Sequence, residues 1–407
     1  MTKMSTIILP ISYQHFYLDN FYLFSLYKTL DFSNFVRKIP LILMKTESKV
    51  NSDVLTLHKT LKEGLKTSLN NAHIRLMSFL ILALCKVQDV CLMKLANSFQ
   101  HTAKPQSSMR RIQRFLADVD LDPLSIARFI FKLLPAKGPY TLSMDRTNWQ
   151  FGSVDINALF LGITYNGVAF PLLFTMLPKK GNSNTCERIA LMDRYIRLFG
   201  RESIECIVAD REFVGKEWLG YLNNMRIPYH IRIKENFYAV RHGREIKVWQ
   251  LFGHLKYNQT LVLEPIYYVN QEACYLAGSC VKNKEGKPEL QVIVSYNNNA
   301  MALDRYKRRW QIETCFRAMK SSGFNIENTH LTDLKRIERL FLVMMIAFTW
   351  AYLVGLHQHL CFRPIRTLKN GRKAKSFLKY GLELIAAYLF NNYIKTDFQY
   401  FEKLSCA

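Results

Sequence analysis

Acidic residues are scarce in this sequence. The 407 residues include 32 Asp and Glu against 56 Lys and Arg, so the formal net charge is +24. An excess of this size points to a polyanionic partner, most commonly nucleic acid. A membrane surface or a merely soluble basic protein is the alternative, but the basic residues do not cluster as a membrane contact would require. We therefore predict a nucleic-acid partner and no membrane contact.

Paired cysteines and ligand-forming histidines are also lacking. The nine Cys are spaced irregularly and none forms a C-x-x-C pair, which argues against a zinc module and against a disulfide framework. None of the ten His lies in a pattern typical of a metal ligand or a catalytic base. Reduced thiols are typical of cytoplasmic proteins, and we predict that location.

Long apolar runs are nearly absent. The exception is Leu340–Leu356, which is just long enough to span a membrane but is interrupted by Thr349 and Gly355. No second run supports a membrane span, so we predict a helix buried in a large core. Residues 1–43 are aromatic and irregular and lack the features of a signal peptide. We predict that the functional chain starts at Met44 and that residues 1–43 are an upstream extension; an additional docking segment is the alternative.

Residues 44–137 have a helical pattern. Apolar residues recur at three- and four-residue spacing in 55–69, 74–87 and 90–99, and further helices are predicted at 109–117 and from Pro123. The helix at 109–117 places three arginines on one side, Arg110, Arg111 and Arg114. Short helices followed by an arginine-bearing helix predict a DNA-binding module of the helix-turn-helix type. The alternative is an ordinary helical domain with a solvated basic face.

From residue 138 the pattern changes to α/β. Strands are predicted at 140–147, 154–165, 168–177, 204–209 and 228–233, with helices at 185–199 and 216–225. An antiparallel hairpin run that merges into a parallel crossover is the order of the ribonuclease-H-like fold. Further strands, at 244–249, 260–269, 273–282 and 290–296, predict a β-rich insertion at 240–297. We therefore predict a ribonuclease-H-like catalytic core at 138–239 and 298–360, interrupted by that insertion, and a basic helical C-terminal region at 361–407.

The segment Tyr306–Lys320, YKRRWQIETCFRAMK, predicts one amphipathic helix. At 100° per residue, Tyr306, Arg309, Glu313 and Lys320 fall within an arc of about 60°. One face of the helix thus carries a phenol, two cations and a carboxylate, while an adjoining apolar stripe can face a core. For Arg309 and Glu313 alone, an i,i+4 ion pair on a solvated helix is the simpler reading.

The spacing of Tyr306, Arg309, Glu313 and Lys320 resembles the YREK signature of bacterial insertion-sequence transposases of the DDE class. These form the IS-four family, relatives of the Tn-five and Tn-ten enzymes. The resemblance extends to SMDRTNW from Ser143, LPKKGNSNTCERIAL from Leu177 and ADREFVGKEWL from Ala209, and covers about residues 55–390. It implies a catalytic triad of Asp145, Asp210 and Glu313, a β-rich insertion, and action as a homodimer on paired DNA ends.

The residues of this triad suit one kind of chemistry. Asp145 and Asp210 are predicted at strand ends, and the fold would pack Glu313 beside them. Three carboxylates in one cleft need a compensating cation, and hard oxygen ligands suit Mg²⁺ or Mn²⁺. Two such ions can activate a water and stabilise the leaving 3′ oxygen in phosphodiester cleavage. The structural alternatives are a turn residue for Asp145 and a helix N-cap for Asp210.

Basic and aromatic residues beside the triad are candidate DNA contacts. We predict that Arg309 and Lys320 meet phosphates near the scissile bond and that Tyr306 hydrogen-bonds a phosphate or stacks. Lys179 and Lys180 are candidate backbone contacts or, equally, a solvated loop. Trp310 and Trp249 could stack on an extruded base, but core packing is the better prediction for both.

By resemblance this is a cut-and-paste transposase. It would bind terminal inverted repeats in double-stranded DNA, free a 3′-OH by hydrolysis, and transfer that end to target DNA without a covalent protein intermediate. Two alternatives stay open: a ribonuclease-H-like nuclease without strand transfer, and an inactive DNA-binding remnant of a mobile element. The intact triad and signature weigh against the remnant.

Overall fold

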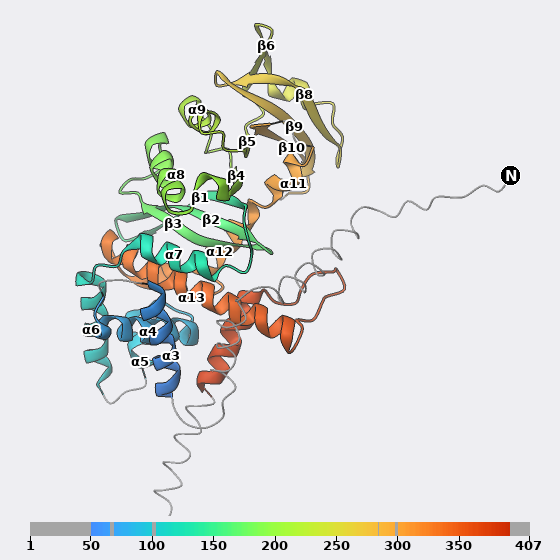
Figure 1. Cartoon of the computed structure of the whole chain (residues 1–407). Coiled ribbons are helices and arrows are strands. Elements are labelled where there is room, and N and C mark those ends of the chain that lie inside the picture. Colours follow the sequence, from blue (N-terminus) through green and yellow to red (C-terminus); the bar gives the residue numbers. More distant parts are fainter. Residues whose placement is uncertain (1–49, 66–68, 100–102, 284, 298–299, 391–407) are drawn as a thin grey trace, which may run out of the picture.

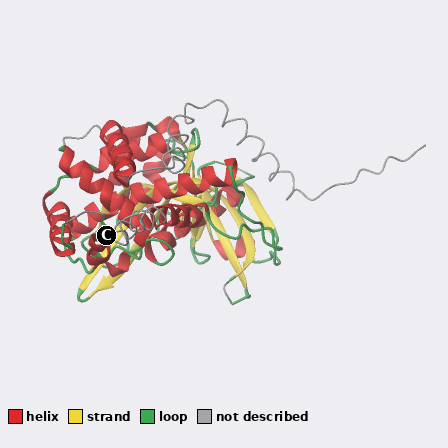
Figure 2. Cartoon of the chain, turned by 90° about the horizontal axis from the view of Figure 1, so that it is seen from below, coloured by secondary structure: helices red, strands yellow, loops and turns green. Residues whose placement is uncertain are grey.

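The computed structural model describes residues 50–390, apart from 66–68, 100–102, 284 and 298–299. The predicted upstream extension and Met44 lie outside the described residues, as does the end of the C-terminal region from 391 onward. The described chain is a mixed α/β protein with a large sheet and separate helical regions, as predicted. Helices gather at one end, and the sheet extends away from them (Figures 1 and 2).

Within the described residues, five helices precede the sheet: α3 (Val50–Leu65), α4 (Asn71–Val87), α5 (Leu92–Asn97), α6 (Pro105–Asp118) and α7 (Pro123–Leu133). Side chains cap two of them: Asn70 Oδ1 accepts from the backbone of His73 at 2.8 Å, and Asp122 accepts from two amides of α7. Helix α6 starts at Pro105, four residues before its predicted start, because proline is tolerated in the first turn of a helix.

One ten-stranded sheet runs through the molecule in the order β3-β2-β1-β4-β5-β10-β9-β8-β6-β7. Its first half comprises β1 (Tyr140–Phe151), β2 (Val154–Tyr165), β3 (Val168–Met176), β4 (Ile204–Ala209) and β5 (Tyr229–Ile233). β1, β2 and β3 are antiparallel neighbours, whereas β1 pairs in parallel with β4 and β4 with β5. Asn166 and Gly167, with φ of +44° and +88°, form the predicted two-residue turn between β2 and β3.

The second half of the sheet comprises β6 (Tyr238–Arg241), β7 (Arg244–Lys247), β8 (Thr260–Val269), β9 (Glu272–Lys282) and β10 (Pro288–Ser295). β10 pairs antiparallel with β5, so these strands continue the first half without a break. The strand predicted at 244–249 ends at Lys247 and gives way to α10 (Val248–Phe252). Val248 and Phe252 are fully buried, and their four-residue spacing places both on one side of a helix.

Further helices pack against the sheet. α8 (Thr185–Phe199), α12 (Trp310–Lys320) and α13 (Leu334–Cys361) contact its first half, α9 (Lys216–Asn224) contacts β9 of the second half, and α11 (Ala302–Lys307) contacts strands of both halves. α13 runs between the N-terminal helices and the sheet (Figure 1) and contacts α4, α6, α7 and β3. In the described part of the chain, it is the one helix long and apolar enough to cross a membrane, and its apolar window is wholly buried inside the protein. The prediction of a buried core helix is thus confirmed.

The last described segment packs against the helices at one end of the molecule. Residues 377–390 form a helix that lies against α13. The two backbones approach so closely at Gly355 and Gly381 that a Cβ on Gly355 would lie 1.8 Å from the Phe377 carbonyl oxygen. Gly355, which interrupts the apolar run in the sequence, therefore serves this contact.

Candidate active site

Asp145 and Asp210 lie at one edge of the parallel part of the sheet. Asp145 sits inside β1, opposite Phe160 of β2, because β1 continues to Phe151 instead of ending near residue 147 as predicted. Its parallel pairing with β4 stops one residue earlier, at Met144 and Ala209. Asp210 is the residue that follows β4. The two carboxylates therefore emerge side by side where β4 ends, next to a strand that continues beyond it.

The signature segment forms two helices, not the one predicted. α11 ends at Lys307 and α12 begins at Trp310. Between them the amides bond three residues back: Arg309 N donates to Tyr306 O at 2.9 Å and Ile312 N to Arg309 O at 3.2 Å. This tightening of the helix occurs where Tyr306 and Arg309, 2% and 4% exposed, turn into the protein.

Arg309 links two carboxylates of the predicted triad, Asp145 and Glu313. Its Nη1 lies 3.3 Å from Asp145 Oδ2, and its Nη2 donates to Glu313 Oε1 at 2.5 Å. Tyr306 OH donates to Asp210 Oδ1 at 3.5 Å. The structure thus brings Asp145, Asp210, Tyr306, Arg309 and Glu313 together, from three segments far apart in the sequence.

The electrostatics reflect burial and crowding of like charges. Burial raises the pKa of Asp145 to about 7; nearby Glu212 and Asp210 add to this effect, while Arg309 opposes it. Burial also raises the pKa of Tyr306, and Asp210 raises it further. For Arg309, burial lowers the pKa, but Tyr306, Asp210 and Asp145 together outweigh burial and the net shift is upward. Arg309 is therefore firmly charged, and it neutralises part of the negative charge around it.

The arrangement does not fit a metal ion as it stands. Carboxylate oxygens are the ligands that Mg²⁺ prefers. However, among the residues that the structure describes, no three Asp, Glu, His or Cys side chains lie close enough together to hold an ion. The Arg309 guanidinium instead pairs with both Asp145 and Glu313. The predicted convergence of the triad into metal-bridging reach is therefore not found in this arrangement.

The remaining predicted DNA contacts lie outside this cluster. Lys320 Nζ donates to Asn148 O of β1 at 2.7 Å and pairs with Glu327 at 3.1 Å. In the loop after β3, Lys179 pairs with Glu187 at 2.9 Å and Lys180 with Asp155 at 3.2 Å. On α6 the three arginines, Arg110, Arg111 and Arg114, are exposed.

Both tryptophans predicted to pack in the core are instead exposed. Trp249 is 47% exposed on α10, and Trp310 is 51% exposed at the start of α12. The predictions rested on apolar character alone, but the buried positions of these helices are taken by Phe252 and Ile312. The Arg309 guanidinium lies over the Trp310 ring, 4.7 Å from its centroid. This contact places an exposed aromatic surface directly beside the carboxylates.

Sequence reasoning missed a second ion pair beside the triad. Arg146 Nε lies 3.4 Å from Glu212 Oε1, and Arg146 also donates to Asn157 at 3.0 Å and Asn182 at 3.2 Å. These contacts fix the loop after β3 beside Asp145. Glu212 follows Asp210 by two residues within the quoted ADREFVG block, so the acidic pair itself was visible in the sequence.

Comparison with known families supports the resemblance to transposases of the DDE class. Residues 145–350 match the family model described as Transposase DDE domain. Comparison with curated protein sequences finds no match. The matched residues begin at Asp145, contain Asp210 and Glu313, and extend into α13, so the match spans the whole cluster around Arg309. With half of its length matched, the chain belongs to the transposase DDE domain family.

Proposed function

We propose that this protein is the DNA transposase of a bacterial insertion sequence of the IS-four group. It acts on double-stranded DNA in the cytoplasm, at the nucleoid, and it binds the terminal inverted repeats as a homodimer. One observation carries the proposal: within a transposase DDE domain, the buried Arg309 contacts both Asp145 and Glu313, and Tyr306 beside it contacts Asp210. A structural ion pair would need one carboxylate beside Arg309, not two.

The architecture supports the same proposal. The strand order β3-β2-β1-β4-β5, with one antiparallel run and two parallel pairs, is that expected of a ribonuclease-H-like core. The exposed arginines of α6 supply a basic helix face for binding DNA. Both features belong to the proposal together with the YREK assignment of Tyr306, Arg309, Glu313 and Lys320.

The proposed chemistry consists of two in-line displacements at phosphorus. In the first, water attacks the phosphorus at the end of the element, the bond to the 3′ oxygen breaks, and one proton of the water ends on that oxygen. In the second, the freed 3′-OH attacks a phosphorus in target DNA, and its proton passes to the target 3′ oxygen that leaves. Phosphodiester bonds are conserved in the second step, so no cofactor has to supply energy.

The present contacts of Arg309 conflict with the binding of metal ions at the same carboxylates. DDE transposase domains typically use divalent metals, and we propose two Mg²⁺ or Mn²⁺ ions for this chain. Because Arg309 occupies the space between Asp145 and Glu313, ion binding requires that it gives up at least one of these contacts. The freed guanidinium would then be available to a DNA phosphate, and Lys320, the last residue of α12, is a second candidate for such a contact.

The test is a joining assay. A labelled duplex with a pre-cut element end is incubated with the full chain, Mg²⁺ and target DNA, beside an uncut duplex that reports hydrolysis. The proposal predicts both cleavage of the uncut duplex and covalent joining of the pre-cut end. Cleavage without joining would identify a nuclease instead, and binding without either reaction would identify a remnant.

A further inference from the structure

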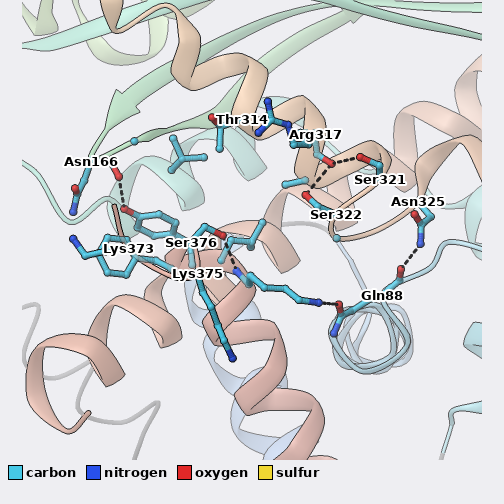
Figure 3. Close-up of a pocket in the computed structure, with 18 residues that line it drawn as sticks. Gln88, Asn166, Thr314, Arg317, Ser321, Ser322, Asn325, Lys373, Lys375 and Ser376 are labelled. Carbon is cyan, nitrogen blue, oxygen red and sulfur yellow. Dashed lines mark hydrogen bonds between the residues drawn. The ribbon is translucent and has the colours of Figure 1, made fainter. Parts of the chain in front are cut away.

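A cavity of about 610 Å³ lies beside α12 (Figure 3). Its walls come from five places: the C-terminal end of α4, the β2–β3 turn, α12 with the loop that follows it, Tyr352 of α13, and residues between 373 and 379. Its volume is in the range of ligand-binding cavities. Nothing in the proposed chemistry uses it.

Hydrogen bonds tie these walls to one another. Asn325 Nδ2 donates to Gln88 O at 2.9 Å, and Lys379 Nζ donates to Gln88 Oε1 at 3.1 Å. Tyr352 OH donates to the carbonyl of Asn166 in the β2–β3 turn at 3.5 Å. All three contacts join segments distant in the sequence (Figure 3). The cavity is therefore fixed by the fold and is not a gap between independent loops.

Every charged residue that lines the cavity is a cation. They are Arg317, Lys373, Lys375 and Lys379, and the lining contains no Asp or Glu. Lys375 pairs with Glu383 on the neighbouring turn. In the part of the chain that the structure describes, Arg317 and Lys373 form no ion pair, and burial lowers the pKa of Lys373. Positive charge thus accumulates here, and among the described residues the charge of Lys375 alone is paired with a carboxylate.

The neutral groups of the lining favour the same kind of ligand. Ser376 Oγ accepts from Lys379 N at 3.1 Å and so caps the helix at 377–390. The first turn of that helix forms part of the cavity wall, and a helix N-terminus adds partial positive charge. Thr314 and Ser321 place hydroxyls on the opposite wall. Cations, hydroxyls and a helix N-terminus without a carboxylate suit an anion whose oxygens accept hydrogen bonds, which is the chemistry of phosphate.

We propose that this cavity binds the phosphate backbone of DNA, at a site separate from the carboxylates of the triad. The inference rests on the proposed function, because the cavity would be a second binding site for the same DNA. Glu313 and Arg317 lie one turn apart on α12, about 6 Å along its axis, so a strand reaching Glu313 can reach Arg317 within about two nucleotides. Helix α12 then carries the catalytic carboxylate and, one turn further along the same side, a cation of the backbone clamp.

The test compares variants of the full chain by fluorescence anisotropy with a labelled duplex of arbitrary sequence, over a range of salt concentrations. R317Q with K373Q removes the two cations that have no ion pair. R197Q with K216Q is the matched control, since both residues are exposed on helices that do not line the cavity. R317K with K373R keeps the charge. Thermal unfolding of each variant checks the fold.

The proposal predicts that R317Q with K373Q weakens binding at least about tenfold and lowers the salt slope by about two. The control and the charge-keeping variant should bind as wild type, and inorganic pyrophosphate should compete with DNA. Equal affinity and slope in R317Q/K373Q and the control would overturn the clamp, while cleavage by that variant would leave the proposed function standing. Pyrophosphate binding that needs Arg317 and Lys373 but leaves DNA affinity unchanged would identify a small-anion site instead. A wild-type chain that binds no duplex would overturn both.

Discussion

Arg309 Nη1 lies 3.3 Å from Asp145 Oδ2, and both side chains are largely buried. An arginine held this way does for the carboxylates what a metal ion would do, because it compensates their charge. Its other amino group is bonded to Glu313, and its Nε is buried without a partner in the part of the chain that the structure describes. Because the guanidinium pairs with both Asp145 and Glu313, we propose that Arg309 and divalent ions compete for these carboxylates, so that binding of one excludes the other.

The first prediction concerns this exclusion. Arg309→Ala removes a buried cation and leaves Asp145 and Glu313 uncompensated, so the variant should be less stable by about 3–5 kcal/mol without metal. Mn²⁺ should then raise its melting temperature more than that of wild type, since the ion no longer competes with the guanidinium. Differential scanning fluorimetry with and without Mn²⁺ measures both effects. Arg308→Ala is the control, because Arg308 is half-exposed and pairs with Glu205 on the surface; equal Mn²⁺ shifts in all three proteins would contradict the exclusion.

The second prediction concerns α6. Arg110→Ala with Arg114→Ala removes two exposed cations from this helix and leaves its buried side untouched. Binding to element ends should weaken about tenfold or more and the salt slope should fall by about two, with thermal stability unchanged. A gel-shift titration against Arg197→Ala with Lys216→Ala measures the difference. Normal end binding by the α6 variant would remove this helix from the DNA interface.

The third prediction concerns the contact between α13 and the C-terminal helix. A Cβ on Gly355 would lie 1.8 Å from Phe377 O and 2.7 Å from Gly381 N, so Gly355→Ala forces the two helices apart. We expect a loss of about 2–4 kcal/mol in the free energy of unfolding, measured by urea denaturation. At Gly215 a Cβ meets open space, and Gly215→Ala should cost little. Similar losses in the two variants would show that the close approach does not hold the helices together.

The fourth prediction concerns pH. His230 is fully buried on β5, and its Nδ1 lies 2.9 Å from Ser295 Oγ. Burial, and to a lesser extent Arg305, lowers its pKa to about 4. The unfolded chain, with a histidine pKa of about 6.5, therefore binds more protons than the folded chain between about pH 4 and 6.5. Stability contributed by neutral His230 is present above about pH 6.5 and is lost as the pH falls toward 4, by up to about 3 kcal/mol.

Urea denaturation at pH 7 and pH 5 measures this loss. His230→Gln should show a smaller decrease in stability between the two pH values than wild type, whatever its stability at pH 7. His254→Gln, which changes an exposed histidine, should retain the wild-type decrease. An unchanged pH dependence in His230→Gln would contradict the assignment of a neutral buried imidazole.

Much of the sheet was predictable because local signals agree there. β2 and β4 begin and end as predicted, and so does α8. β2 is followed by the Asn166–Gly167 turn, which fixes where the hairpin reverses. α8 begins with a capping box between Asn184 and Glu187, a signal contained within four residues. In each case the sequence pattern and the tertiary environment favour the same boundary.

The signature segment was less predictable for a physical reason. Its apolar spacing continues through Arg308 and Arg309, so periodicity alone predicts one helix. The break follows from contacts that periodicity does not contain, since Tyr306 reaches Asp210 and Arg309 reaches Asp145 on two other segments. The family pattern located these residues but not the contacts that Tyr306 and Arg309 form.

The central claim is that Glu313 is catalytic, and Glu313→Gln tests it most directly. Glutamine is nearly isosteric and a comparable helix former, so α12 should persist and DNA binding should not weaken, since a negative charge is removed beside phosphates. Cleavage should fall by orders of magnitude, because the amide lacks the charge that the reaction needs. The measurement follows end binding and strand cleavage on the same labelled duplex. The account predicts wild-type binding with almost no cleavage; cleavage at near the wild-type rate would contradict it and reduce Glu313 to the ion-pair partner of Arg309.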